Sequence, residues 1–265
     1  MVLRGVVNHV PTWLLLIAVV TAIGALVLLL VWVVRRFVPG VREGFDAEVS
    51  SQMLGVVAAL FGLLFAFVIV IAYQNYTDAQ SNVSNEADAL AAVVRNSGAF
   101  PQPERIRVRD AIGNYVRAVV DDEWPRMRRG EDSAHAWTAV GGMFTALQGF
   151  DPNSPRAKAF YDDSVRQLNT ALVARRDRLD AANGGLPWVI AALILVGSLV
   201  MVGYAVLVGS TSFWFHTIGA GAIALVVGLS LVVLVDLTYP FSGDLSVNPG
   251  SFETGILGQF FSRAN

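Results

Sequence analysis

Four apolar runs, two near each end of the chain, constrain the fold of this sequence more than any other feature. They cover residues 13–34, 53–73, 188–208 and 213–235, and none contains Asp, Glu, Lys or Arg. Each reaches the roughly 20 residues that a helix needs to cross a hydrocarbon core of about 30 Å. Because backbone amides in lipid must be hydrogen-bonded internally, each run is expected to be a helix. The sequence predicts a multi-pass membrane protein.

Composition places the charges in the middle of the chain. Charged residues make up 15% of the sequence, against roughly 25% in soluble domains, and most of them lie in residues 74–186. The net charge of −2 gives no basic surface for a nucleic-acid partner. The absence of Cys excludes disulfides and thiolate metal sites.

The predicted fold is all-α, with four transmembrane helices in a 2+2 arrangement flanking a soluble helical insertion. The second apolar run continues without Pro or Gly toward Ala99, with apolar residues at helical spacing. Three further helices are expected. One ends at Trp124-Pro125, one covers residues 131–150, and one runs from a Ser154 cap to Ala182. Short hairpins are expected at Pro39-Gly40 and over residues 209–212. The predicted segments are 1–73 (first pair), 74–186 (helical domain), 187–235 (second pair) and 236–265 (irregular tail).

No catalytic motif or metal-ligand spacing occurs in the sequence, so neither an enzyme nor a bound cofactor or metal is expected. The run Asp121-Asp122-Glu123 has two interpretations. It could bind a cation, but a solvated helix end is favoured because runs of charge are usually surface features.

The second apolar run carries two stripes at helical spacing. Small residues form one stripe, which would let another membrane helix approach closely. Bulky residues form a neighbouring stripe, which could face a central axis and gate a pore by dewetting. Ordinary packing against helices or lipid is the alternative. The small stripe is Gly55, Ala59, Gly62 and Ala66, and the bulky stripe is Leu54, Phe61, Phe65 and Val68.

His216 lies near the start of the fourth run. It could titrate in a conduction or sensing path. It could instead lie at the membrane interface and bond to a backbone carbonyl or to Ser212, and this second interpretation is favoured by its position.

Four short segments carry a family resemblance. They are residues 62–67, Asn85-Glu86-Ala87 with Leu90 and Arg95, Glu123-Trp124-Pro125, and Pro240-Phe241-Ser242-Gly243-Asp244-Leu245. In this order they resemble a family of uncharacterised bacterial membrane proteins described as bestrophin-like, and more distantly the bestrophin anion channels. The resemblance implies a pentamer permeable to inorganic anions, whose second span lines an apolar neck at positions similar to Phe61 and Phe65. The single Asp244 replaces the several acids of the animal channels' calcium clasp, so calcium binding is not expected.

Two functions follow from these observations. The first is a homo-oligomeric anion channel in lipid, and the second is a non-conducting sensor or scaffold whose helical domain binds a protein partner. The resemblance places that domain in the cytoplasm of a bacterium, bounded by its inner membrane. The arginines flanking the spans do not decide the orientation, since four lie on the domain side and three on the other. They are Arg4, Arg175, Arg176 and Arg178 against Arg35, Arg36 and Arg42.

Overall fold

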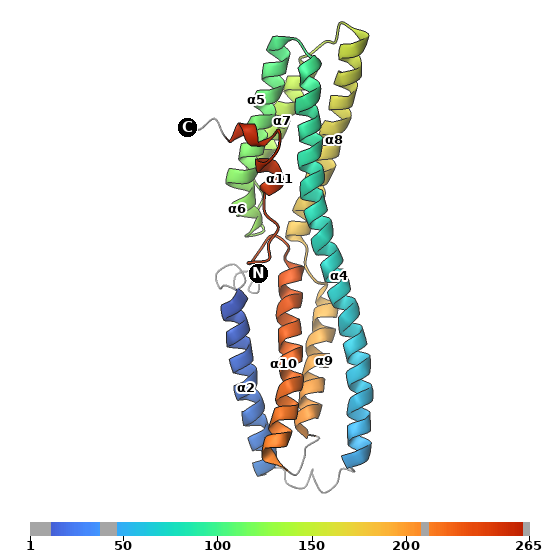
Figure 1. Ribbon diagram of the computed structural model, residues 1–265, viewed down its shortest axis with the longest axis vertical. Coiled ribbons are helices and arrows are strands. Elements are labelled where there is room, and N and C mark those ends of the chain that lie inside the picture. The colour runs from blue at the N-terminus through green and yellow to red at the C-terminus, as the bar shows by residue number, and fades with distance from the viewer. Residues whose placement is uncertain (1–11, 38–46, 208–211, 262–265) are drawn as a thin grey trace. The chain divides into compact units, whose positions relative to one another are not determined.

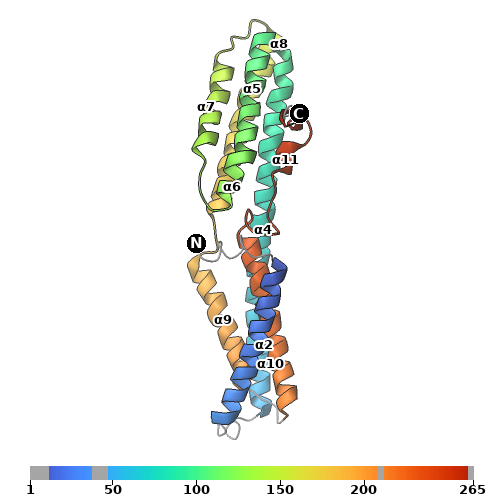
Figure 2. The same ribbon diagram turned by 90° about the vertical axis from the view of Figure 1, so that its left-hand side faces the viewer.

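The computed structural model describes residues 12–37, 47–207 and 212–261, and these residues form helices and turns with no strand. Figure 1 and Figure 2 show the helices from two directions. The all-α prediction is therefore confirmed for the described residues. Two compact units are present. We call residues 1–74 with 185–238 the apolar unit, and residues 75–184 with 239–265 the polar unit.

The apolar unit contains four helices that are long and apolar enough to cross a membrane, which supports a multi-pass membrane protein. They are α2 (Thr12–Phe37), the first part of α4 (Ala47–Asn96), α9 (Trp188–Leu207) and α10 (Phe213–Thr238). The predicted hairpin at Pro39-Gly40, and residues 209–211 of the other predicted hairpin, lie outside the described residues.

Two apolar clusters hold this unit together. Val27 and Val31 of α2 pack with Ala220 and Ala224 of α10. The close approach of α2 to α10 depends on Gly228 of α10, because a Cβ there would overlap the side chain of Ile23 of α2. The second cluster joins α4 to α9 and α10, and consists of Phe65, Val68, Ala72, Ile194 and Leu234.

The polar unit is built from the second part of α4 and the helices that follow it. These are η1 (Ser97–Ala99), α5 (Gln102–Ala118), the π-turn η2 (Val119–Glu123), α6 (Trp124–Met127), α7 (Ala134–Gln148) and α8 (Pro155–Asn183). The predicted cap at Ser154 is present, since its Oγ accepts from the Ala157 amide at 3.1 Å. Ser133 caps α7 in the same way, accepting from Ala136 at 3.0 Å. The sequence predicts that the preceding helix ends at Trp124-Pro125, whereas the chain stays helical to Met127.

The C-terminal segment belongs to the core of the polar unit. It contains the short helices α11 (Gly250–Glu253) and η3 (Gly258–Phe260), where the sequence analysis expects an irregular tail. Its aromatic residues Phe241, Phe252 and Phe260 lie in the same buried cluster as residues of α4, α5 and α8. Gly113 of α5 makes room for Phe260, whose ring would lie 2.7 Å from an added Cβ. Residues after the last membrane helix thus complete the core.

We expect Phe252→Ala to destabilise the full-length protein by about 3–5 kcal/mol, because removing a fully buried ring leaves a cavity. Thermal unfolding in detergent, followed by circular dichroism, measures the loss as a lower midpoint. Phe160→Ala is the matched control, since that ring is 37% exposed and its removal should cost less than about 1 kcal/mol. Equal midpoints for the two variants would show that the C-terminal segment is not part of the core.

Candidate functional site

The predicted pore stripe lies on the covered side of α4. Phe65 and Val68 are each 6% exposed and pack on α9 and α10. Phe61 is half-buried, and its ring fills the space that a side chain on Gly197 would take. Leu54 is also half-buried. Within one chain, the bulky stripe therefore forms the contact with the other apolar helices.

Phe61 and Phe65 also line an open groove of about 550 Å³ between α4 and α10. Its walls are apolar apart from Ser230. Apart from the Ser230 hydroxyl, no side chain that lines this groove could replace the hydration shell of an ion, so the groove is suited to apolar groups.

The predicted packing stripe is exposed. Gly55, Ala59, Gly62 and Ala66 all lie on the surface of the chain, and an added Cβ on Gly55 or Gly62 would meet no atom within 4 Å. The sequence raises the small stripe as a face for another helix and the bulky stripe as a pore face, with ordinary packing as the alternative. Within the single chain the bulky stripe packs on α9 and α10 and the small stripe is exposed. The pore face depends on the assembly and stays a prediction.

His216 is buried in the apolar unit at 6% exposure. Its Nε2 lies 3.3 Å from the carbonyl oxygen of Ala205. Of the two interpretations of His216, this geometry favours the hydrogen bond to a backbone carbonyl.

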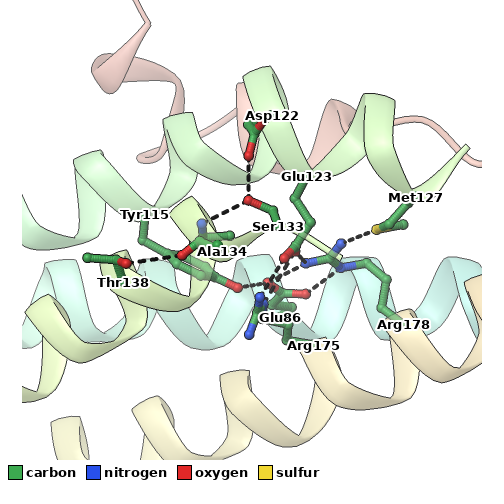
Figure 3. Close-up of polar contacts among 11 residues, drawn as sticks. Glu86, Tyr115, Asp122, Glu123, Met127, Ser133, Ala134, Thr138, Arg175 and Arg178 are labelled. Carbon is green, nitrogen blue, oxygen red and sulfur yellow. Dashed lines mark hydrogen bonds and ion pairs between the residues drawn. The ribbon is translucent and has the colours of Figure 1, made fainter. Parts of the chain in front are cut away.

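The polar unit contains a buried ionic cluster, shown in Figure 3. We define it as Glu86 of α4, Tyr115 of α5, Glu123 of η2, and Arg175 and Arg178 of α8, all of which are at most 1% exposed. Two carboxylates face two guanidinium groups, so the charges balance. Four helical elements meet at this cluster.

Arg178 connects the two carboxylates. Its Nε donates to Glu86 Oε2 at 2.7 Å, and its Nη2 donates to Glu86 Oε1 at 3.1 Å and to Glu123 Oε1 at 2.7 Å. Arg175 Nη2 donates to Glu123 Oε2 at 2.5 Å, and Tyr115 Oη donates to Glu86 Oε1 at 2.5 Å. The planar, multi-donor guanidinium is suited to this bridging role, whereas a lysine ammonium is not.

The pKa values of two cluster members are shifted. Burial alone would lower the pKa of the Arg178 guanidinium, but the Glu86 carboxylate raises it above its ordinary value. Burial, and then the charge of Glu86, raises the pKa of Tyr115 well above its ordinary value. Arg178 is therefore charged and Tyr115 is a neutral hydrogen-bond donor throughout the physiological range.

A π-turn delivers Glu123 to the cluster. Pro125 has no N–H, and its ring conflicts with a regular helical turn before it. The chain accommodates it by widening the helix over Val119–Glu123, and the Trp124 amide bonds to Val119 O, five residues back. Such π-turns frequently occur at functional sites.

Aromatic rings enclose the cluster. The Arg175 guanidinium lies 4.1 Å from the ring centroid of Trp137, and that of Arg178 lies 5.3 Å from Trp124. Trp124 meets Phe241 edge-to-face at 5.7 Å. The segments that the sequence analysis singled out, Glu86, Glu123-Trp124-Pro125 and Pro240-Phe241, thus supply Glu86, Glu123, Trp124 and Phe241 to one site.

Backbone interactions hold the loop after Phe241. The Val247 amide donates to Pro240 O at 2.7 Å, and Gly243 has a φ of 79°, a conformation that favours glycine. Asp244 is exposed. Among the described residues, no group of three or more His, Cys, Asp and Glu side chains could hold a metal ion.

The acidic run Asp121-Asp122-Glu123 is not a solvated helix end as a whole. Asp121 is exposed, but Glu123 is fully buried in the ionic cluster. Asp122 accepts from Arg126 Nε at 2.8 Å and from Ser133 Oγ at 2.5 Å, and these bonds lower its pKa. The favoured interpretation is therefore wrong for Glu123, which the π-turn directs inward.

Sequence reasoning missed Tyr115, Arg175 and Arg178 as partners of Glu86 and Glu123. A signal was present on α8, where Leu168, Ala171, Arg175, Arg178 and Ala182 follow one another at intervals of three or four. Arginines within such an apolar stripe indicate buried carboxylate partners, since buried charges are paired. The positions of those partners, 52 and 92 residues away, could not be read from spacing.

A family model described as the bestrophin-like domain matches residues 21–252. The matched range includes the ionic cluster, its aromatic shell and most of each apolar helix. No curated protein and no solved structure matches this chain.

We expect Arg178→Met to destabilise the full-length protein by about 3–5 kcal/mol, because it leaves Glu86 buried without a cationic partner. Arg176→Met is the matched control, as its side chain is 83% exposed and lies 3.9 Å from Asp180. The thermal midpoint in detergent should fall for the first variant and stay near that of the parent for the second. The thermal midpoint of Arg178→Lys should lie between those of the two Met variants, since lysine keeps the charge but loses the bridging geometry.

The raised pKa of Tyr115 predicts a loss of stability at high pH. The unfolded chain loses the tyrosine proton above about pH 10, whereas the folded chain keeps it, so the free energy of unfolding falls as pH rises past that value. Tyr115→Phe removes this contribution, although it lowers stability at neutral pH by about 1 kcal/mol through the lost hydrogen bond. Thermal midpoints between neutral pH and pH 11 should fall less steeply for the variant. Parallel curves would contradict the prediction.

Proposed function

This chain belongs to the bestrophin-like family, and from that premise we propose that several copies assemble into an anion-permeable channel of the bacterial cytoplasmic membrane. The four apolar helices cross the lipid as two pairs, and the polar unit lies in the cytoplasm. Inorganic anions are the permeant species, and α4 lines an apolar neck.

The observation that carries this proposal is that α4 is covered on one side only. Opposite the Phe65 side, α4 exposes bulky apolar residues at intervals of four, three and four. These are Val56, Leu60, Leu63 and Phe67, each at least 57% exposed. In a membrane such a face is covered by lipid or by other copies of the chain, because none of the described helices of the same chain reaches it.

Two faces of α4 are candidates for the neck. The exposed stripe from Val56 to Phe67 can face a shared axis without any change in the chain. The stripe of Leu54, Phe61, Phe65 and Val68 can do so only if α4 turns by about half a turn on assembly, given 3.6 residues per helical turn. We therefore assign the neck to the exposed stripe and keep the Phe61/Phe65 stripe as the alternative.

The small stripe fits this assembly. Gly55, Ala59, Gly62 and Ala66 lie beside the exposed bulky stripe and let a second helix approach the α4 backbone closely. In a ring of copies, the surface beside each axis-facing stripe meets the neighbouring copy. Small residues are suited to that position.

A non-conducting membrane anchor is the second candidate. The absence of Asp, Glu, Lys and Arg from the four apolar runs favours it, since transport paths often place such groups within the membrane. In this case the polar unit would carry the function by binding a partner protein.

Anion flux into liposomes tests both candidates and both faces. We expect Leu60→Ala with Phe67→Ala to raise the flux about tenfold, which corresponds to a barrier lower by about 1.4 kcal/mol, because smaller side chains let water wet the neck. Phe61→Ala with Phe65→Ala removes the same kind of bulk from the covered face. It lowers stability because Phe65 is buried, but the flux per intact oligomer should stay near that of the parent.

Light scattering corrected for bound detergent gives the number of copies for each variant. If the covered-face variant alone conducted more, α4 would have turned on assembly. An intact oligomer with no flux in any variant would exclude the channel and support the anchor.

A further inference from the structure

The polar unit carries two grooves, formed by different helix pairs. The α5/α7 groove has a volume of about 860 Å³ and includes Arg107, Asp110 and Arg117. The α4/α8 groove has a volume of about 680 Å³ and includes Asp88, Arg95 and Asp177. We define the two groove surfaces by these helices.

The two groove surfaces carry charges that complement one another. The α5/α7 groove has Asp110 and Arg117, besides Arg107, which is paired with Glu104 at 2.7 Å, and the α4/α8 groove has Asp88, Asp177 and Arg95. Arg117 bonds to Asn114 Oδ1 and to Phe260 O and has no carboxylate partner in the described part of the chain. Within the same residues, Asp88 and Asp177 form no ion pair.

The charges on the two groove surfaces also lie at similar positions along the helix axes. Glu86 bonds to both Tyr115 and Arg178, so we take these three residues as a common reference level, defined to within the reach of their side chains. Both α5 and α8 run antiparallel to α4 (Figure 1). At 1.5 Å per residue, Asp88 and Asp177 lie about 3 Å and about 1.5 Å from this level toward Asn96, and Arg117 lies about 3 Å in the other direction.

The second charge pair has the same offset. Arg95 lies about 13 Å and Asp110 about 7 Å above that level, on the rise of 1.5 Å per residue. Both sets of opposite charges therefore differ in height by about 6 Å or less, which the long arginine side chains can span. A second copy placed at the same height as the first, with its helices parallel, lets both arginines reach across this difference to their carboxylate partners.

An apolar contact lies at a matching height. Val173 is 62% exposed on the otherwise polar outer face of α8, beside the α4/α8 groove. It lies about 7 Å above the reference level, and Ala111 of the α5/α7 groove lies about 6 Å above it. Ala139 and Gly142 of α7 also line that groove, and a Cβ on Gly142 would meet no atom within 4 Å. Small residues leave room there for a valine.

We infer that the α5/α7 groove surface of one copy binds the α4/α8 groove surface of the next copy. This inference rests on the proposed homo-oligomer and specifies its contact in the polar unit. Two different surfaces that bind each other head-to-tail close into a ring when the rotation allows it. Exposed ion pairs are worth only about 0–1 kcal/mol each, so here they fix the register of the contact, and Val173 supplies its apolar part.

Cross-linking tests this contact directly, because the chain has no cysteine of its own. The full-length double variant Ala111→Cys/Val173→Cys is treated in membranes with a short bis-maleimide and separated on a denaturing gel. We expect a ladder of bands up to the full subunit number. Each single variant should stay monomeric on the gel, since a head-to-tail contact does not bring identical positions together. Arg129→Cys/Val173→Cys controls for random collision, because Arg129 is exposed and lies in neither groove.

The outcomes separate this inference from the proposed function. An oligomer by light scattering without a ladder in the double variant would overturn the contact and leave the channel proposal standing. Cross-linked dimers from a single variant would also overturn it, since they indicate a two-fold contact. A monomer by light scattering would overturn both.

A charge reversal provides the second test. Arg117→Asp should reduce the cross-linked fraction of the double cysteine variant several-fold at low salt, and Asp88→Arg should do the same. Combining the two reversals should restore the ladder, which a merely misfolded Arg117 variant would not do. Failure of the combination to restore cross-linking, with both single reversals folded, would overturn the pairing of Arg117 with Asp88.

Discussion

The buried carboxylate of Glu86 on α4 needs a cationic partner, and the packing of the polar unit brings Arg178 to it. Moving two carboxylates and two guanidinium groups out of water costs several kcal/mol per ion, which only close, well-oriented partners offset. Arg178 supplies that geometry by bonding Glu86 and Glu123 at once. Because its two partners belong to α4 and η2, the arginine fixes where α8 packs. The rings of Trp124 and Trp137 then exclude water from the cluster.

The helices could be predicted from the sequence because their signals are local. Apolar runs gave the membrane-length helices, and Ser154 with Pro155 marked the start of α8. The interior of the polar unit could not be predicted as fully. Glu123 follows two aspartates, and only the π-turn that accommodates Pro125 turns it into the core. Its partner Arg175 lies 52 residues away, and no periodicity connects the two.

The second apolar helix, the first part of α4, shows a different limit of prediction from sequence. Its periodicity identified a small stripe and a bulky stripe, but periodicity fixes only the angle between stripes. Which one faces α9 and α10 is set by tertiary packing, and in this chain Phe61 and Phe65 fill the space beside those helices. The result leaves Gly62 and Ala66 on the surface and gives α4 a free bulky side.

The placement of the C-terminal segment in the polar core sets an order of events during synthesis. Glu86 emerges from the ribosome long before Arg178, and Phe241 and Phe252 emerge only after α10 has been made. The ionic cluster therefore cannot form until α8 is available, and its aromatic enclosure cannot close until the last apolar helix has left the ribosome. Until then Glu86 lacks the Arg178 partner that it has in the folded chain.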